Sequence, residues 1–87
     1  MKYEGSNPLA KLHLDEPYFF IRAQDALAVK AVLAYADLLG AASVNFAEKN
    51  DFQTAKRLIP QELEVKSIAQ AIEDWQALNP QLVKFPD

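Results

Sequence analysis

The single histidine is the side chain of this 87-residue sequence best suited to proton transfer. His13 stands near Asp15 and Glu16, and an imidazole beside a carboxylate can act as a general base. We expect this stretch to be loosely ordered, which favours a surface histidine. None of the serines is flanked by the glycines of a nucleophile elbow. The sequence therefore predicts no catalytic residue, and we expect that the protein is not an enzyme.

Composition disfavours cofactor and metal sites. The chain has no cysteine and only two glycines, which excludes thiolate ligands and a glycine-rich phosphate loop. One histidine is too few for zinc sites that need two imidazoles. No acidic residues have the spacing of a calcium-binding loop, so solvated helix faces explain the neighbouring carboxylates. We expect no metal and no cofactor. These carboxylates are Glu48 with Asp51, Glu62 with Glu64, and Glu73 with Asp74.

One group of basic residues suggests phosphate binding. Acidic residues surround the group in sequence, and the chain carries a net charge of −3, whereas nucleic-acid-binding domains are typically basic. Association with another protein is therefore favoured, and nucleic-acid binding is the alternative function. The group consists of Lys49, Lys56, Arg57 and Lys66.

Arg22 and Asp25 lie where an aromatic segment meets the first predicted helix. Asp25 is a candidate N-cap, because a carboxylate there can accept a hydrogen bond from the first turn. An arginine so close to Phe19 and Phe20 is expected to be partly desolvated and to need a carboxylate or carbonyl partner. We predict that Arg22 and Asp25 brace this turn and do not bind a ligand.

Residues 18–22 are the best candidate for a β-strand, because aromatic and β-branched residues favour strands. An extended segment that packs without pairing is the alternative. Alternation in a strand would place Tyr18 and Phe20 on one face, with Phe19 and Ile21 on the other. Both faces would then need cover. Since aromatic residues are enriched in interface cores, we predict that Tyr18 and Phe20 contact a partner.

The run over 26–39 predicts a helix that is apolar around most of its circumference. Its apolar arc spans about 240° on a helical wheel, whereas a surface helix needs only roughly 100°. We expect too little material elsewhere in the chain to cover this arc, so we predict a homo-oligomer or a complex with another protein. Val29, Val32 and Leu33 are the predicted interface residues of this helix, together with Trp75 of a later one.

Gly40 leaves the end of this helix open to two interpretations. Glycine is a common residue just past a helix C-terminus, which ends the helix at 39. The alternative is one continuous rod over 26–48, because no proline follows and the apolar spacing continues.

Two more helices are predicted after this point. The first covers 51–59, with Asn50 and Gln53 as a capping box. The second covers 61–78, because Pro60 can close one helix and open the next.

These elements predict a mainly α fold, a compact bundle of about three helices in a single domain over 1–87. The ends are predicted to be a loosely ordered arm over 1–16 and an extended tail over 80–87. An α+β fold with a small two-stranded ribbon is the alternative if 18–22 pairs. No targeting segment and no apolar run of membrane-spanning length is evident, so we expect a cytoplasmic protein without a membrane segment.

Residues 16–28, Glu-Pro-Tyr-Phe-Phe-Ile-Arg-Ala-Gln-Asp-Ala-Leu-Ala, resemble a group of small phage and prophage proteins. In that group, a proline, aromatic and aliphatic residues and Arg-Ala-Gln-Asp lead into a helix. Trp75-Gln76 and residues 84–87, Lys-Phe-Pro-Asp, match two later features, whereas residues 41–59 depart from the pattern. The resemblance implies an origin in a virus or mobile element and assigns no functional residue.

Overall fold

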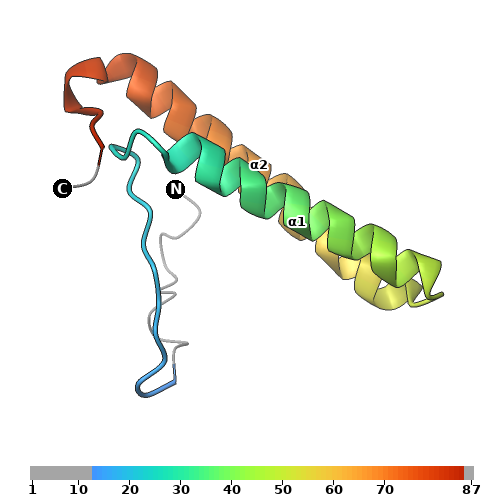
Figure 1. The fold of residues 1–87 in the computed structure, drawn as a ribbon. Helices are drawn as coiled ribbons and strands as arrows, with labels where there is room; N and C mark the ends of the chain where they lie inside the picture. Colours follow the sequence, from blue (N-terminus) through green and yellow to red (C-terminus); the bar gives the residue numbers. More distant parts are fainter. Residues whose placement is uncertain (1–12, 86–87) are drawn as a thin grey trace.

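The computed structural model describes residues 13–85, which form a hairpin of two long helices (Figure 1). Helix α1 spans Ala28–Glu48 and helix α2 spans Phe52–Leu78, and the two lie side by side along their length. A 3₁₀ turn, η2, follows at Pro80–Leu82. The mainly helical fold is confirmed, but the prediction of three helices is wrong.

Helix α1 passes through Gly40 without a break, so the continuous rod is the correct alternative for this region. The helix begins at Ala28, two residues later than predicted. Leu27 is its N-cap and makes no side-chain capping hydrogen bond. The predicted end at residue 39 is wrong because α2 packs against α1 on both sides of Gly40 and supports the helix there.

Helix α2 passes through Pro60, so the predicted break between helices over 51–59 and 61–78 is also wrong. Proline lacks an N–H, and inside a helix it costs about 3 kcal/mol. Helical stability in proteins comes mostly from tertiary packing. The contact of α2 with α1 extends on both sides of Pro60, which offsets the local penalty.

Small side chains form the centre of the contact between the helices. Along the side of α1 that faces α2, apolar and small residues are spaced alternately three and four positions apart. This spacing is typical of paired helices. The Ser43 hydroxyl donates a hydrogen bond of 3.1 Å to the carbonyl oxygen of Ala55, so the two backbones lie close together. Among residues 13–85, the buried ones are Ala28, Ala36 and Ser43 of α1 with Ala55 and Ala69 of α2.

The turn between the helices caps α2 differently from the predicted capping box. Asp51 is the N-cap, and its carboxylate accepts hydrogen bonds from the Thr54 backbone N–H at 3.1 Å and the Thr54 hydroxyl at 2.8 Å. Asn50 adopts a left-handed conformation with φ of 65°, which asparagine tolerates better than most residues. The pairing of Asn50 with Gln53 is therefore wrong by one position.

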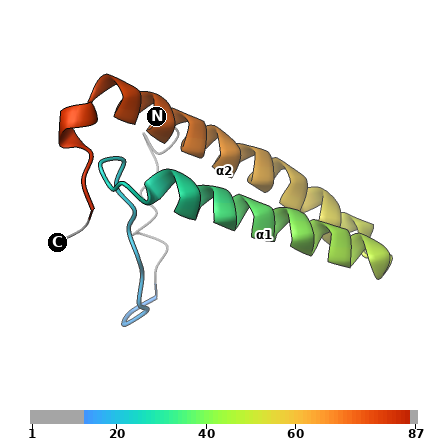
Figure 2. The same ribbon diagram turned by 45° about the horizontal axis from the view of Figure 1, so that its top comes forward.

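The molecule is elongated, in contrast to the predicted compact bundle. Its Cα radius of gyration is 15.3 Å and its extents are 48 × 31 × 25 Å. A compact domain of this length would have a radius of gyration of about 12 Å. Two helices and an arm that leaves them therefore make up a molecule with little interior (Figure 2).

Residues 18–22 are extended but do not form a strand, and the structure contains no strand within 13–85. The alternative of a two-stranded ribbon is therefore wrong, and an isolated parallel bridge between Asp25 and Lys84 is what the structure has instead. Residues 83–85 of the predicted tail are extended, after the 3₁₀ turn. Residues 1–12 of the predicted arm and 86–87 of the tail lie outside the described residues.

Candidate functional site

The start of α1 and the end of the chain are joined at one end of the hairpin. The backbone N–H of Lys84 donates to the Gln24 carbonyl at 2.9 Å, and the Ala26 N–H donates to the Lys84 carbonyl at 2.8 Å. The tail therefore runs beside the turn that leads into α1. These two bonds fix where the aromatic segment (residues 18–21) leaves the hairpin.

The side chain of Gln76 on α2 holds the same turn. Its amide nitrogen donates to the Ala23 carbonyl at 2.8 Å and to the Asp25 carbonyl at 2.9 Å. Both bonds are partly buried, and each joins positions about fifty residues apart in the sequence. Sequence reasoning missed Gln76, because a glutamine on a helix gives no signal of the distant carbonyls that it will meet.

Arg22 and Asp25, the predicted brace, lie in different surroundings. The Asp25 carboxylate accepts a hydrogen bond of 2.8 Å from the Leu27 N–H, which tightens the turn before α1. The Arg22 side chain is exposed, and it has no hydrogen bond or ion pair within residues 13–85. The Arg22 backbone carbonyl accepts from the Asp25 N–H at 3.0 Å.

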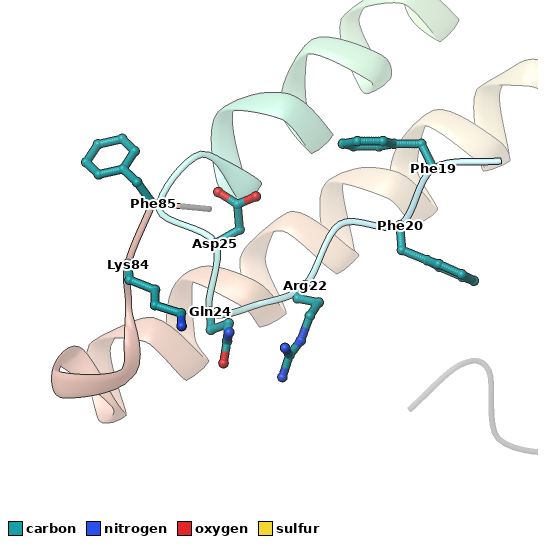
Figure 3. Close-up of a pocket in the computed structure, with 7 residues that line it drawn as sticks. All are labelled: Phe19, Phe20, Arg22, Gln24, Asp25, Lys84 and Phe85. Atoms are coloured by element: carbon teal, nitrogen blue, oxygen red, sulfur yellow. The ribbon is translucent and has the colours of Figure 1, made fainter. Parts of the chain in front are cut away.

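A pocket of about 390 Å³ opens beside this junction (Figure 3). Its walls come from the aromatic segment, the turn and the tail, and Phe19 and Phe20 leave the segment in different directions. The lining combines phenylalanine rings with the charged side chains of Arg22, Asp25 and Lys84, so it can hold a group that is partly apolar and partly charged. The lining residues are Phe19, Phe20, Arg22, Gln24, Asp25, Lys84 and Phe85.

The aromatic segment is largely open to solvent. Tyr18 is 61% exposed, Phe20 is 59% exposed and Phe19 is 83% exposed. The rings of Tyr18 and Phe20 pack edge to face with centroids 5.0 Å apart. The two predicted interface aromatics therefore lie on the same side of the extended chain.

The other predicted interface residues divide between two surfaces. Val29 and Val32 are half-buried, and their positions on the helix place them towards α2. Trp75 is half-buried as well. Leu33 is 40% exposed and remains open to solvent. Of these four residues, Leu33 is thus the most available to a partner.

A second apolar surface of α1 was not singled out in the sequence, although it lies on the same apolar arc. Its residues fall within about 120° on the helical wheel, on a flank of α1 next to the surface that meets α2. All of them are exposed, and Leu38 is exposed by 68%. We call this surface the open stripe. It consists of Leu27, Ala31, Ala34, Tyr35, Leu38 and Ala41.

The basic residues do not gather into one patch. Lys66 forms an ion pair with Glu62, with Nζ and Oε2 2.9 Å apart. The hydrogen bond that Lys66 donates to the Glu62 carboxylate raises the pKa of Lys66 above its usual value. Lys56 and Arg57 are consecutive on α2, so they point about 100° apart, and Lys49 lies in the turn between the helices.

Within residues 13–85, acidic and histidine side chains form no group of three or more that could hold a metal ion. No protein-family model, curated protein or solved structure matches the chain. The exposed apolar surfaces of the aromatic segment and α1 are therefore the features on which a function can be argued.

Proposed function

We propose that this protein acts by protein–protein association and that it assembles with copies of itself. The observation that carries the proposal is the number of large apolar side chains that stay open to solvent within residues 13–85, on the aromatic segment and on both helices. Exposed apolar surface of this kind marks sites of association between proteins.

The chemistry of the exposed surface supports association. Tyr35, Leu38 and Val44 of α1 are each more than half exposed, and so are Phe52 and Leu63 of α2. No large side chain within 13–85 is fully buried. A small protein with little core is commonly stabilised by a disulfide, a metal or a partner. The chain has no cysteine, and a second copy supplies the missing apolar contact.

Solution mass tests the proposal, with two substitutions as matched probes. Leu38→Glu places a charge on the open stripe, whereas Ser67→Glu places the same charge at an exposed position on the outer side of α2. We expect an oligomer for the wild type and Ser67→Glu, and a weakened or monomeric state for Leu38→Glu. A monomer for all three proteins at high micromolar concentration would overturn the proposal.

We propose that the protein works in the cytoplasm. We also propose that it is an accessory protein of a phage or another mobile element. The origin rests on the resemblance of residues 16–28. Helix α1 is long and apolar enough to cross a membrane by length and composition, but it carries Lys30 and Asp37, which are costly in a bilayer. Fractionation of expressing cells tests the setting: recovery without detergent supports it, and recovery only with detergent contradicts it.

A further inference from the structure

We infer that the pocket beside Lys84 binds a small anion that carries a flat aromatic ring, of the arylalkanoate class. The inference goes beyond the proposed self-association, because residues of one chain build the pocket. Its volume of about 390 Å³ lies within the range of small-molecule sites, which combine apolar walls with a few polar groups. Phenylalanine rings supply the apolar walls here.

Arg22 brings a positive charge to the lining that no carboxylate of the described chain offsets. Its side chain is exposed and has no hydrogen bond or ion pair within residues 13–85. The Asp25 carboxylate accepts a hydrogen bond from the Leu27 N–H at 2.8 Å, and it is turned towards α1, away from Arg22 (Figure 3). The forked donors of a guanidinium match a carboxylate, so a ligand can supply the partner that Asp25 does not.

The charge balance of the lining favours a ligand with one negative charge. Among residues 13–85, the lining has two cationic side chains, Arg22 and Lys84, and one carboxylate, Asp25. The side chain of Gln24 adds neutral donors and extends to the same side of the turn as Arg22 (Figure 3). Because complementary charge gives specificity, this balance matches a carboxylate better than a doubly charged phosphate ester.

The position of Phe20 sets the place of the aromatic ring. Phe20 and Arg22 are two positions apart in an extended segment, so their side chains leave the same face about 6–7 Å apart. Figure 3 shows both extending to that side, whereas Phe19 leaves in another direction. Aromatic rings pack favourably edge to face or offset. A ring on Phe20 therefore needs a short carbon chain to bring its carboxylate to Arg22, which is the form of an arylalkanoate.

Titration of the full chain with phenylpropionate, followed through backbone amide chemical shifts, tests this site. We expect saturable binding, with the largest shifts at residues 19–25 and 83–85. Phenylpropanol keeps the ring and the linker but lacks the charge, and acetate keeps the charge but lacks the ring. Each should bind at least tenfold more weakly than phenylpropionate. Equal affinity for phenylpropanol, or no saturable binding of phenylpropionate at millimolar concentration, would overturn the inference.

Two matched substitutions locate the charge. Arg22→Gln should weaken phenylpropionate at least tenfold and leave phenylpropanol unchanged. Arg57→Gln makes the same change at an exposed position near the start of α2, at the other end of the hairpin (Figure 1), and should bind like the wild type. Arg22 lies outside the helices, so the helical circular dichroism should not change. Equal affinity of Arg22→Gln and the wild type would contradict the site.

The result is independent of the solution mass. A monomer that binds phenylpropionate through Arg22 would support this site and overturn the proposed function. An oligomer that does not bind it would overturn the site and leave the proposed function standing.

Discussion

Gly40 on α1 lies directly against the carboxylate of Glu62 on α2. A Cβ atom added at position 40 would be 3.0 Å from Glu62 Oε1, which is closer than an ordinary van der Waals contact. The same carboxylate forms the ion pair with Lys66. Gly40 therefore makes room for a charged side chain between the helices and does not end α1.

Gly40→Ala tests this relationship. Alanine favours the helix by about 1 kcal/mol over glycine, but its methyl group must displace the Glu62 side chain. The displaced pair of Glu62 with Lys66 is worth a few tenths of a kcal/mol. We expect a net gain in the free energy of unfolding of up to about 1 kcal/mol, measured by chemical denaturation. In a Glu62→Ala background the gain should be larger, and a loss of stability in both backgrounds would contradict the account.

Pro60→Ala is expected to stabilise the hairpin. Alanine restores the N–H that α2 lacks and removes the clash of the proline ring with the preceding turn. The expected gain in the free energy of unfolding is up to about 3 kcal/mol, read as a higher midpoint of thermal unfolding. A lower midpoint would mean that the proline geometry is itself needed for the contact with α1.

Gln76→Ala should release the turn that precedes α1. Two partly buried hydrogen bonds are lost, at about 1 kcal/mol each, so we expect a loss of about 1–2 kcal/mol in the free energy of unfolding. Gln76→Glu keeps the shape but replaces the donor with an acceptor, and it should be at least as destabilising. Unchanged stability of both variants would show that the bonds to Ala23 and Asp25 contribute nothing.

The cap of α2 predicts a stability that depends on pH. Hydrogen bonds from the side chain and backbone of Thr54 lower the pKa of Asp51 below its usual value of 3.8. A carboxyl with a lowered pKa in the folded state stabilises the protein above pH 3.8, and this contribution is lost as pH falls through the folded-state pKa. We expect the unfolding midpoint of the wild type to drop over that acidic range.

Asp51→Asn is the matched control for this pH effect. Asparagine caps a helix about as well as aspartate but does not titrate. The difference in stability between wild type and variant should therefore shrink as the solution is acidified below pH 3.8. A difference that stays constant with pH would contradict the role of the Asp51 carboxylate.

The sequence predicts a mainly helical chain, but not the number of helices or where they end. The apolar spacing of α1 is strong enough to indicate a long helix and its wide apolar arc. Pro60 and Gly40 each predicted a helix end that the structure does not have. The contact between α1 and α2 overrides their local preferences, and a local sequence pattern does not reveal that contact. The predicted cap of α2 is wrong by one position because Asn50 and Asp51 are both good capping residues.

The candidate site is only partly visible in the sequence. Tyr18, Phe20 and Leu33 are exposed, and their role as interface residues stays a prediction. The bonds of Gln76 and the pocket beside Lys84 depend on how distant segments meet, so no local pattern reveals them. The open stripe around Leu38 is evident on the wheel only when the position of α2 is known.

The solution mass of the wild-type chain tests the central claim most directly. Sedimentation equilibrium over a range of concentrations gives this mass without any substitution. The account predicts twice 9.7 kDa or a higher multiple, because the aromatic segment and the open stripe are apolar and stay exposed among residues 13–85. A mass of 9.7 kDa at high micromolar concentration, with intact helices, would contradict it.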